Sequence, residues 1–156
     1  MKKTKIFIKP LDTEQEITEC ASFISNTEPW NILKITAEQL ENTLRDRFYE
    51  SYIAYVGDEI AGVAIIQLKG VCTGYLKSIA VKEKFRKNKI GSLLMDYIEK
   101  RIFSIHPNVF LCVSSFNEGA KRFYIKRGYN EIGIIKDYVV EGYDEILMRK
   151  SKGPIS

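Results

Sequence analysis

The stretch Ser78–Arg101, SIAVKEKFRKNKIGSLLMDYIEKR, joins a short apolar segment to an amphipathic one through a strongly basic turn. Ser78–Val81 is typical of the end of a buried strand, and the residues after the turn have apolar side chains at helical spacing. We expect five of these side chains to face inward: Ile90, Leu93, Leu94, Tyr97 and Ile98. The turn holds five cations and a single acid, Glu83; the cations are Lys82, Lys84, Arg86, Lys87 and Lys89. The stretch therefore predicts a strand that feeds into a helix with a positively charged start.

Such a turn is suited to binding phosphate. The first four N–H groups of a helix have no partner inside it, and the helix dipole adds partial positive charge there. Gly91 has no Cβ, so a ligand can approach the backbone closely at that point. A solvated basic loop is the alternative, and it is the commoner meaning of a run of charges alone. Gly91 and the preceding strand favour a ligand with several phosphates.

Outside this stretch the sequence alternates between strand-like and helical segments. Two segments begin with a capping box, Thr13 with Glu16 and Thr36 with Gln39. A third, short helix is predicted after Asn117 as its N-cap and before Gly128. Strands are expected at 5–11, 51–56, 60–68, 74–81, 108–115, 129–140 and 143–150, with 51–68 forming a hairpin. The pattern predicts an α/β protein with a mixed sheet and helices on both faces.

Composition limits the class of protein. The chain has 156 residues, of which 45% are hydrophobic and 28% charged, as in a globular protein. We expect one domain over residues 1–150 and a flexible tail over 151–156. The start of the chain lacks the pattern of a signal peptide and no run is long enough to span a membrane, so a cytoplasmic location is the default expectation. The net charge of +4 does not call for a nucleic acid, and three widely spaced cysteines suggest neither a disulfide framework nor a metal site.

Two motifs together resemble the GNAT superfamily of N-acetyltransferases, which bind acetyl-coenzyme A (acetyl-CoA). Arg86-Lys87-Asn88-Lys89-Ile90-Gly91 is similar to the family motif [Q/R]-x-x-G-x-[G/A], with Lys89 in place of its first glycine. A lysine suits that position if its dihedral angles are ordinary for a helix or turn. Asn117, Ala120, Tyr124, Gly128 and Tyr129 match N-x-x-A-x-x-x-Y-x-x-x-G-[FY]. The resemblance implies the GNAT fold: one twisted, mostly antiparallel mixed sheet of about six to seven strands flanked by helices.

The resemblance also implies the site residues. Ile79, Ala80 and Val81 would pair with the pantetheine arm of acetyl-CoA, and Arg86–Ser92 would hold its pyrophosphate. The residues in that loop are Arg86, Lys87, Asn88, Lys89, Ile90, Gly91 and Ser92. Asn117 would contact coenzyme A, and Tyr124 would lie near the thioester sulfur. The alternative is that Asn117 is only a helix cap and Tyr124 only a core residue.

Two of these residues have expected chemical roles. The backbone N–H of Ile79 would stabilise the oxyanion, and the phenol of Tyr124, with an ordinary pKa near ~10, would protonate the departing thiolate. A general base is missing from the positions where family members carry a glutamate, because these hold Cys112 and Tyr75 here. Glu28 and Asp144 are candidate carboxylates for that task. We expect Cys112 to be a small core residue rather than a nucleophile.

The sequence thus predicts an acetyl-CoA-dependent N-acetyltransferase that transfers the acetyl group to a primary amine by direct attack in a ternary complex. The acceptor is a protein N-terminus or a small-molecule amine, and the segment Glu28-Pro29-Trp30 slightly favours the first, because it resembles the start of N-terminal acetyltransferases. A non-catalytic coenzyme A-binding module is the alternative. We expect no metal, nucleic acid or membrane partner, and the sequence leaves the oligomeric state open, a homodimer included.

Overall fold

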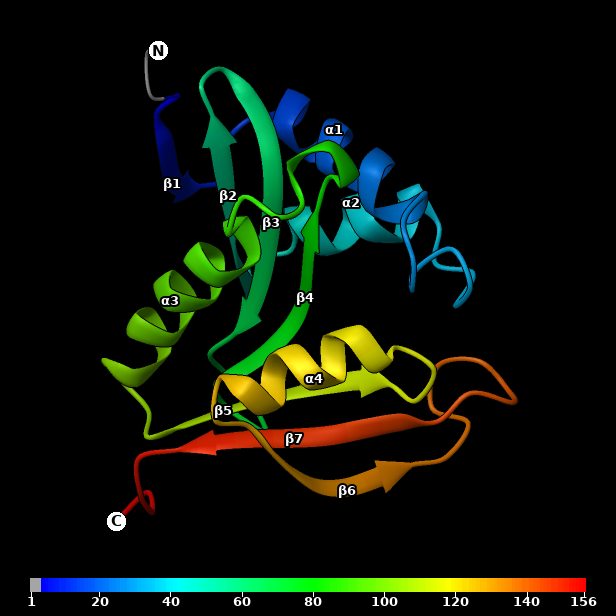
Figure 1. Cartoon of the computed structure of the whole chain (residues 1–156), viewed down its shortest axis with the longest axis vertical. Helices are drawn as coiled ribbons and strands as arrows, with labels where there is room; N and C mark the ends of the chain where they lie inside the picture. Colours follow the sequence, from blue (N-terminus) through cyan, green and yellow to red (C-terminus); the bar gives the residue numbers. More distant parts are fainter. Residues whose placement is uncertain (1–3) are drawn as a thin grey trace.

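All strands join one mixed sheet with helices on both faces. The computed structural model describes residues 4–156, and its sheet has seven strands in the order β1-β2-β3-β4-β5-β7-β6 (Figure 1). Every pairing is antiparallel except that of β4 with β5, which confirms the predicted fold class. The elements are β1 (Ile6–Pro10), α1 (Glu14–Ser25), α2 (Ala37–Arg45), β2 (Tyr49–Val56), β3 (Glu59–Gln67), β4 (Tyr75–Val81), the 3₁₀ turn η1 (Glu83–Phe85), α3 (Ile90–Phe103), β5 (Asn108–Ser114), α4 (Glu118–Lys126), β6 (Asn130–Ile135) and β7 (Glu145–Ser151).

Local signals account for most of these boundaries. The capping box of α2 is complete, since the Thr36 hydroxyl accepts the Gln39 N–H and the Gln39 side chain accepts the Thr36 N–H. Only one of the two hydrogen bonds of the capping box predicted for α1 forms. Thr13 caps the Glu16 N–H, but the Glu16 carboxylate accepts hydrogen bonds from Lys9 and the Asp12 N–H instead. That carboxylate therefore ties the start of α1 to β1.

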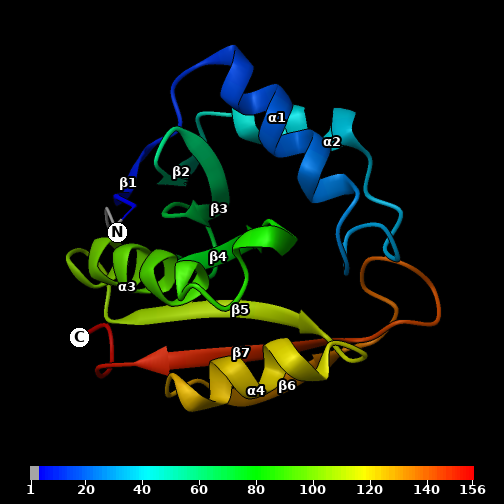
Figure 2. The same cartoon turned by 45° about the horizontal axis from the view of Figure 1, so that its top comes forward.

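Two apolar cores hold the helices against the sheet. One lies between α1, α2 and strands β2–β4, and includes Cys20, Ile24 and Ile53, each fully buried. The other lies under α3 and α4 on the opposite face, and includes Leu94, Met95 and Met148 (Figure 2). The inward face of α3 differs from the prediction. Leu93 and Tyr97 are 38% and 37% exposed, and Met95 and Ile102 fill the core in their place.

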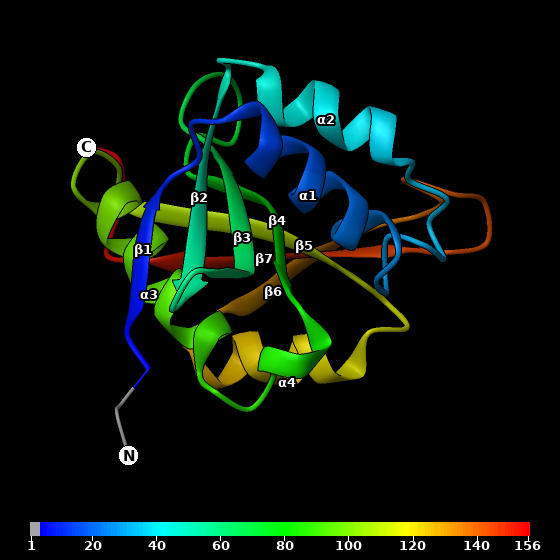
Figure 3. The same cartoon turned by 90° about the horizontal axis from the view of Figure 1, so that it is seen from above.

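The segment after β6 also differs from the prediction of two core strands. β6 ends at Ile135 and β7 begins at Glu145, so residues 136–144 form a loop. Tyr138 is 59% exposed in this loop, and Tyr143 packs edge-on against Phe116. The loop lies beside the connection between α1 and α2, residues 26–36, in each of the three views (Figure 3). The two loops thus form one end of the molecule.

A bulge in β4 changes the direction of its backbone groups. The register against β3 shifts between Ile65 and Ile66, which pair with Ser78 and Leu76, so Lys77 is the extra residue. Beyond the bulge, the Lys82 N–H donates to Ala61 O at 2.8 Å. N–H groups alternate between the two edges of a strand. The N–H groups of Ile79 and Val81 therefore point to the edge away from β3, which faces β5.

Candidate active site

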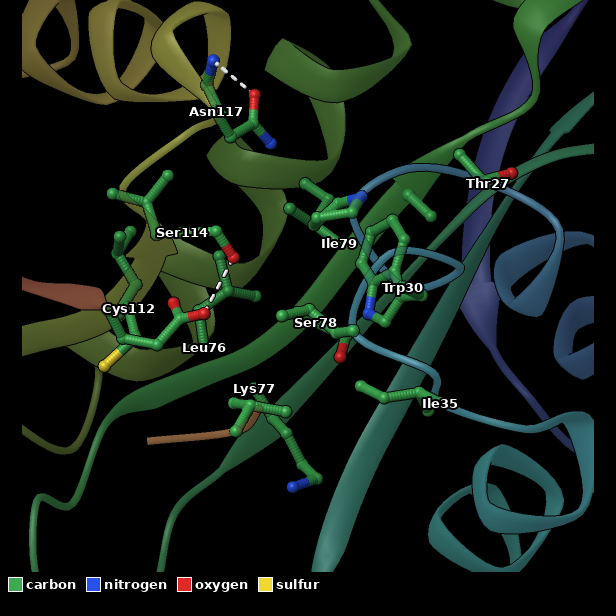
Figure 4. Close-up of a pocket in the computed structure, with 18 of the residues that line it drawn as sticks. Thr27, Trp30, Ile35, Leu76, Lys77, Ser78, Ile79, Cys112, Ser114 and Asn117 are labelled. Atoms are coloured by element: carbon green, nitrogen blue, oxygen red, sulfur yellow. Dashed lines mark hydrogen bonds between the residues drawn. The ribbon is translucent and has the colours of Figure 1, made fainter. Parts of the chain in front are cut away.

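The opening between β4 and β5 holds a cavity. The two strands pair only at Tyr75 with Phe110 and at Leu76 with Leu111, and then separate (Figure 1). A cavity of about 590 Å³ occupies the widening gap (Figure 4). Its walls come from β4, β5, α4 and the loops 26–36 and 136–144. Its lining includes Trp30, Ile35, Tyr49, Leu76, Lys77, Ser78, Ile79, Ala80, Val81, Arg86, Cys112, Ser114, Asn117, Tyr124, Tyr138 and Glu145.

Six of the residues predicted for coenzyme A line this cavity together: Ile79, Ala80, Val81, Arg86, Asn117 and Tyr124. The other six follow Arg86 in the turn and the first turn of α3, outside the cavity lining. Of these, Ile90 is only 1% exposed, because its side chain belongs to the core under α3. Its backbone N–H alone is available to a ligand. The six residues outside the lining are Lys87, Asn88, Lys89, Ile90, Gly91 and Ser92.

The start of α3 has an unusual backbone. Lys89 is the N-cap, with φ 61° and ψ 18° in the left-handed region, and no side chain caps the first N–H groups. A lysine was expected to suit this position if its dihedral angles were ordinary for a helix or turn, and these left-handed angles do not meet that condition. The position requires the conformation that glycine adopts without strain. A left-handed residue followed by helical ones turns successive N–H groups into a concave, anion-binding nest.

Not all five cations of the basic turn are free to bind a ligand. Lys82 pairs with Glu19 at 2.7 Å and Lys84 pairs with Glu59 at 2.5 Å, so neither ammonium faces a ligand alone. Arg86 lines the cavity, and Lys87 and Lys89 are exposed. Within residues 4–156 these three form no ion pair. Three cations rather than five therefore surround the start of α3.

Asn117 and Tyr124 flank the opening from α4. The Asn117 Oδ1 accepts the Ala120 N–H at 3.2 Å, so it caps α4 while its amide group borders the cavity (Figure 4). Tyr124 is 7% exposed, and its ring packs edge-on against Phe123 and Tyr129. Burial raises its pKa, so the phenol stays protonated at neutral pH. The hydroxyl has no hydrogen-bond partner among the described residues, which leaves its proton free for a ligand.

The two residues that occupy the positions of the missing glutamate base lie at the floor of the cavity. The Tyr75 phenol and the Cys112 thiol interact there, and burial is the main cause that raises the pKa of each. Both groups are therefore neutral near pH 7. The Glu145 carboxylate lies beside them and accepts a 2.7 Å hydrogen bond from the Ser114 hydroxyl (Figure 4). Glu145 was not among the predicted site residues, because only the pairing of β5 with β7 brings it next to Ser114.

The two carboxylates proposed from the sequence are placed differently. Glu28 is exposed at the rim of the cavity. The Asp144 carboxylate accepts the Asp137 N–H at 3.2 Å and closes the loop before β7. Trp30 borders the cavity and also packs against the core under α1 and α2.

Comparison with known proteins agrees with this geometry. Residues 12–129 match the model of the acetyltransferase (GNAT) family. The chain belongs to the GNAT family. It is 32% identical over 110 residues to an uncharacterized N-acetyltransferase of Methanocaldococcus jannaschii, which covers 67% of this chain and 70% of the relative. As a GNAT protein, it is an acetyl-CoA-dependent acyltransferase.

Solved structures show the same fold. A GNAT-family acetyltransferase from Desulfovibrio desulfuricans superimposes with a TM-score of 0.80 at 17% identity, over 94% of this chain and 99% of that one. An aminoglycoside 6′-N-acetyltransferase in complex with coenzyme A gives a TM-score of 0.75 at 21% identity, over 95% and 98% of the two chains. No helix within residues 4–156 is long and apolar enough to cross a membrane. Within the same residues, no group of three or more His, Cys, Asp and Glu is placed to hold a metal ion.

Proposed function

We propose that this GNAT protein transfers the acetyl group of acetyl-CoA to a primary amine by direct attack in a ternary complex. The observation that carries the proposal is the separation of β4 from β5, which leaves one cavity between the strands. Its lining runs from Arg86, just before α3, to residues of the loops 26–36 and 136–144. One cavity thus has room for a cofactor near Arg86 and for an acceptor beside the two loops.

The cofactor would occupy the α3 side. The free N–H of Val81 would bind the pantetheine arm as a further strand would, and that of Ile79 would face the thioester carbonyl. Its pyrophosphate would bind the nest at Lys89 and the N–H groups that follow, beside the Arg86 guanidinium. When bound, acetyl-CoA supplies the activated acetyl group. The Ile79 N–H is then the donor for the oxyanion, and Tyr124 is the donor for the departing sulfur.

Direct attack fits the chemistry of the cavity better than an acyl-enzyme. A covalent route needs a thiolate or an activated hydroxyl. Cys112 is the cysteine that lines the cavity, and burial and the nearby Glu145 charge raise its pKa, although Tyr75 opposes that shift. Its thiol stays protonated and is a weak nucleophile. The amine of the second substrate is the remaining nucleophile.

The acceptor side favours a single amine on a largely neutral molecule. Its walls combine the apolar and aromatic side chains of Trp30, Ile35, Tyr49, Tyr138 and Val139 with uncharged polar ones, among them Thr27, Gln39, Thr43 and Gln67. The acids that line the cavity are Glu28 at the rim and Glu145 at the floor, and Lys77 adds a positive charge. A polycationic acceptor would lack acidic partners here. We therefore propose the α-amine of a peptide N-terminus as the first acceptor class and an uncharged small amine as the second.

A panel of acceptors tests the proposal. Purified protein and acetyl-CoA are mixed with short peptides, amino acids, polyamines and aminoglycosides, while thiol release is followed and the acceptors are examined by mass spectrometry. We expect peptides with a free α-amine to accelerate thiol release and to gain an acetyl group. The same peptides with a blocked N-terminus are the matched control. If no acceptor raises thiol release above hydrolysis, the proposal fails and a non-catalytic coenzyme A-binding module takes its place.

A further inference from the structure

A buried carboxylate without a cationic partner lies at the floor of the cavity. Glu145 is the first residue of β7 and is 5% exposed. Its partner is the Ser114 hydroxyl, at 2.7 Å, and within residues 4–156 it forms no ion pair. Burying a charge with so little compensation opposes folding. The other buried acids, Glu16 and Glu99, each pair with a lysine or arginine, so the arrangement at Glu145 is not a structural ion pair.

Among the titratable groups at the cavity floor, Glu145 is the one that can accept a proton. Tyr75 on β4 and Cys112 on β5 lie close enough to feel its charge, and Tyr138 of the loop 136–144 lines the same cavity. Burial keeps the Tyr75 phenol and the Cys112 thiol protonated. Burial also raises the pKa of Glu145, and the Ser114 hydroxyl partly opposes that shift. A carboxylate with a raised pKa is a better proton acceptor near neutral pH than an ordinary one.

We infer that Glu145 is the general base that removes a proton from the acceptor amine. The inference rests on the proposed acetyl transfer and adds the residue that its sequence motifs lack. The position is set by geometry: Ser114 orients the carboxylate in the same cavity that Ile79 and Tyr124 line. Glu145 lines the same cavity as Tyr138 and Val139, which we assign to the acceptor, and as Arg86, which we assign to the cofactor.

The proton balance is complete with the groups present. Glu145 takes one proton from the ammonium form of the acceptor and passes it to water. The free amine attacks the acetyl carbon, so the N–C bond forms and the C–S bond then breaks. The sulfur leaves as a thiolate and takes a proton from Tyr124. The surplus proton on the new amide nitrogen leaves through Glu145 and the solvent, and Tyr124 is reprotonated from water.

Glu145→Gln is the central test, because the amide keeps the size of the side chain and can still accept the Ser114 hydroxyl. We expect kcat/KM to fall by about one hundred- to ten-thousand-fold with a peptide acceptor at neutral pH. The acid limb of the pH profile, which Glu145 sets in the wild type, should follow the pKa of the acceptor amine in the variant, so that the residual rate climbs with pH as the free amine appears. An acceptor amine of low pKa, which needs no base, should recover most of the lost rate. Glu141→Gln, at an exposed position in the loop just before β7, is the matched control and should retain full activity.

Ser114→Ala gives a second readout that does not depend on the loss of the carboxylate. The hydroxyl lowers the pKa of Glu145, so its removal should move the acid limb of the profile to higher pH while leaving the plateau rate nearly unchanged. Acetyl-CoA affinity, measured by calorimetry, should stay within about twofold in both variants.

If the wild type is active and Glu145→Gln has the same activity at every pH, the inference is overturned while the proposed function stands. Loss of acetyl-CoA binding in Glu145→Gln would also overturn it. A wild type inactive with every acceptor would overturn the proposed function and this inference together.

Discussion

The parallel pairing of β4 with β5 ends where Leu76 lies opposite Leu111. One residue later, the bulge at Lys77 reverses the edges to which the β4 backbone groups point. The separation of the strands and the reversal act together, because the first makes space and the second directs the N–H groups of Ile79 and Val81 into it. The cavity is therefore a consequence of backbone geometry, and the side chains around it determine what it binds.

Gly74 fixes the end of β4 that stays paired. Its φ of 87° lies in the left-handed region, and a Cβ there would be 2.3 Å from Asn108 O, while its own carbonyl accepts the Phe110 N–H at 2.9 Å. Gly74→Ala should lower the free energy of unfolding by about 2–3 kcal/mol, from strain and the disturbed hydrogen bond. Urea denaturation measures the change. Gly119→Ala, where an added Cβ meets nothing within 4 Å, should have no such cost; equal stability of the two variants would contradict this role of Gly74.

Lys89→Gly should stabilise the protein. The left-handed conformation strains a lysine by about 1–2 kcal/mol, and the greater freedom of glycine in the unfolded chain offsets part of that gain. We expect the free energy of unfolding to rise by about 0.5–1 kcal/mol, with acetyl-CoA affinity within several-fold of the wild type. Lys100→Gly, the same change inside α3, should lower it by about 1 kcal/mol. A destabilised Lys89→Gly would show that the lysine side chain holds this turn.

Gly91→Val should weaken acetyl-CoA binding without unfolding the protein. A Cβ at Gly91 would lie 3.8 Å from Val81 and 3.9 Å from Phe123, which are ordinary contacts. The fold therefore has room for the Cβ, whereas the branched side chain would stand in the path of the phosphates. Calorimetric titration of the folded variant with acetyl-CoA measures the effect, and Gly91→Ala should give an intermediate loss. Wild-type affinity in Gly91→Val would mean that the phosphates bind elsewhere.

Tyr124→Phe should lower kcat by about one hundred- to ten-thousand-fold, the span expected of a general acid. The ring and its packing remain, so acetyl-CoA affinity should change little and stability should hold within ~1 kcal/mol. Tyr129→Phe is the matched control, because the Tyr129 hydroxyl donates to buried Glu99 at 3.0 Å and lies outside the cavity lining. That variant should lose stability and keep its turnover. Full turnover in Tyr124→Phe would remove the phenol from the mechanism.

Features that depend on neighbours in sequence could be predicted, and those that depend on strand pairing could not. The capping box at Thr36, the cap at Asn117 and the strand before the basic turn follow from local spacing and were confirmed. Glu145 joins the site only because its strand, β7, pairs with β5. This pairing brings it next to Ser114, which lies 31 residues earlier in the sequence. The ion pairs that occupy Lys82 and Lys84 also come from distant segments. The left-handed backbone conformation of Lys89 could not be predicted, because a lysine seldom adopts it.

Amide hydrogen exchange at Ile79 and Val81, resolved by NMR, tests the account most directly. In the free protein these two N–H groups face the gap, whereas the N–H of Ala80 points to β3, so Ile79 and Val81 should exchange faster than Ala80. Saturating acetyl-CoA should slow the exchange of Ile79 and Val81 strongly, because the Val81 N–H would become hydrogen-bonded to the pantetheine arm and the Ile79 N–H to the thioester carbonyl, and Ala80 should change less. Unchanged exchange at Ile79 and Val81 in the presence of saturating acetyl-CoA would contradict the account.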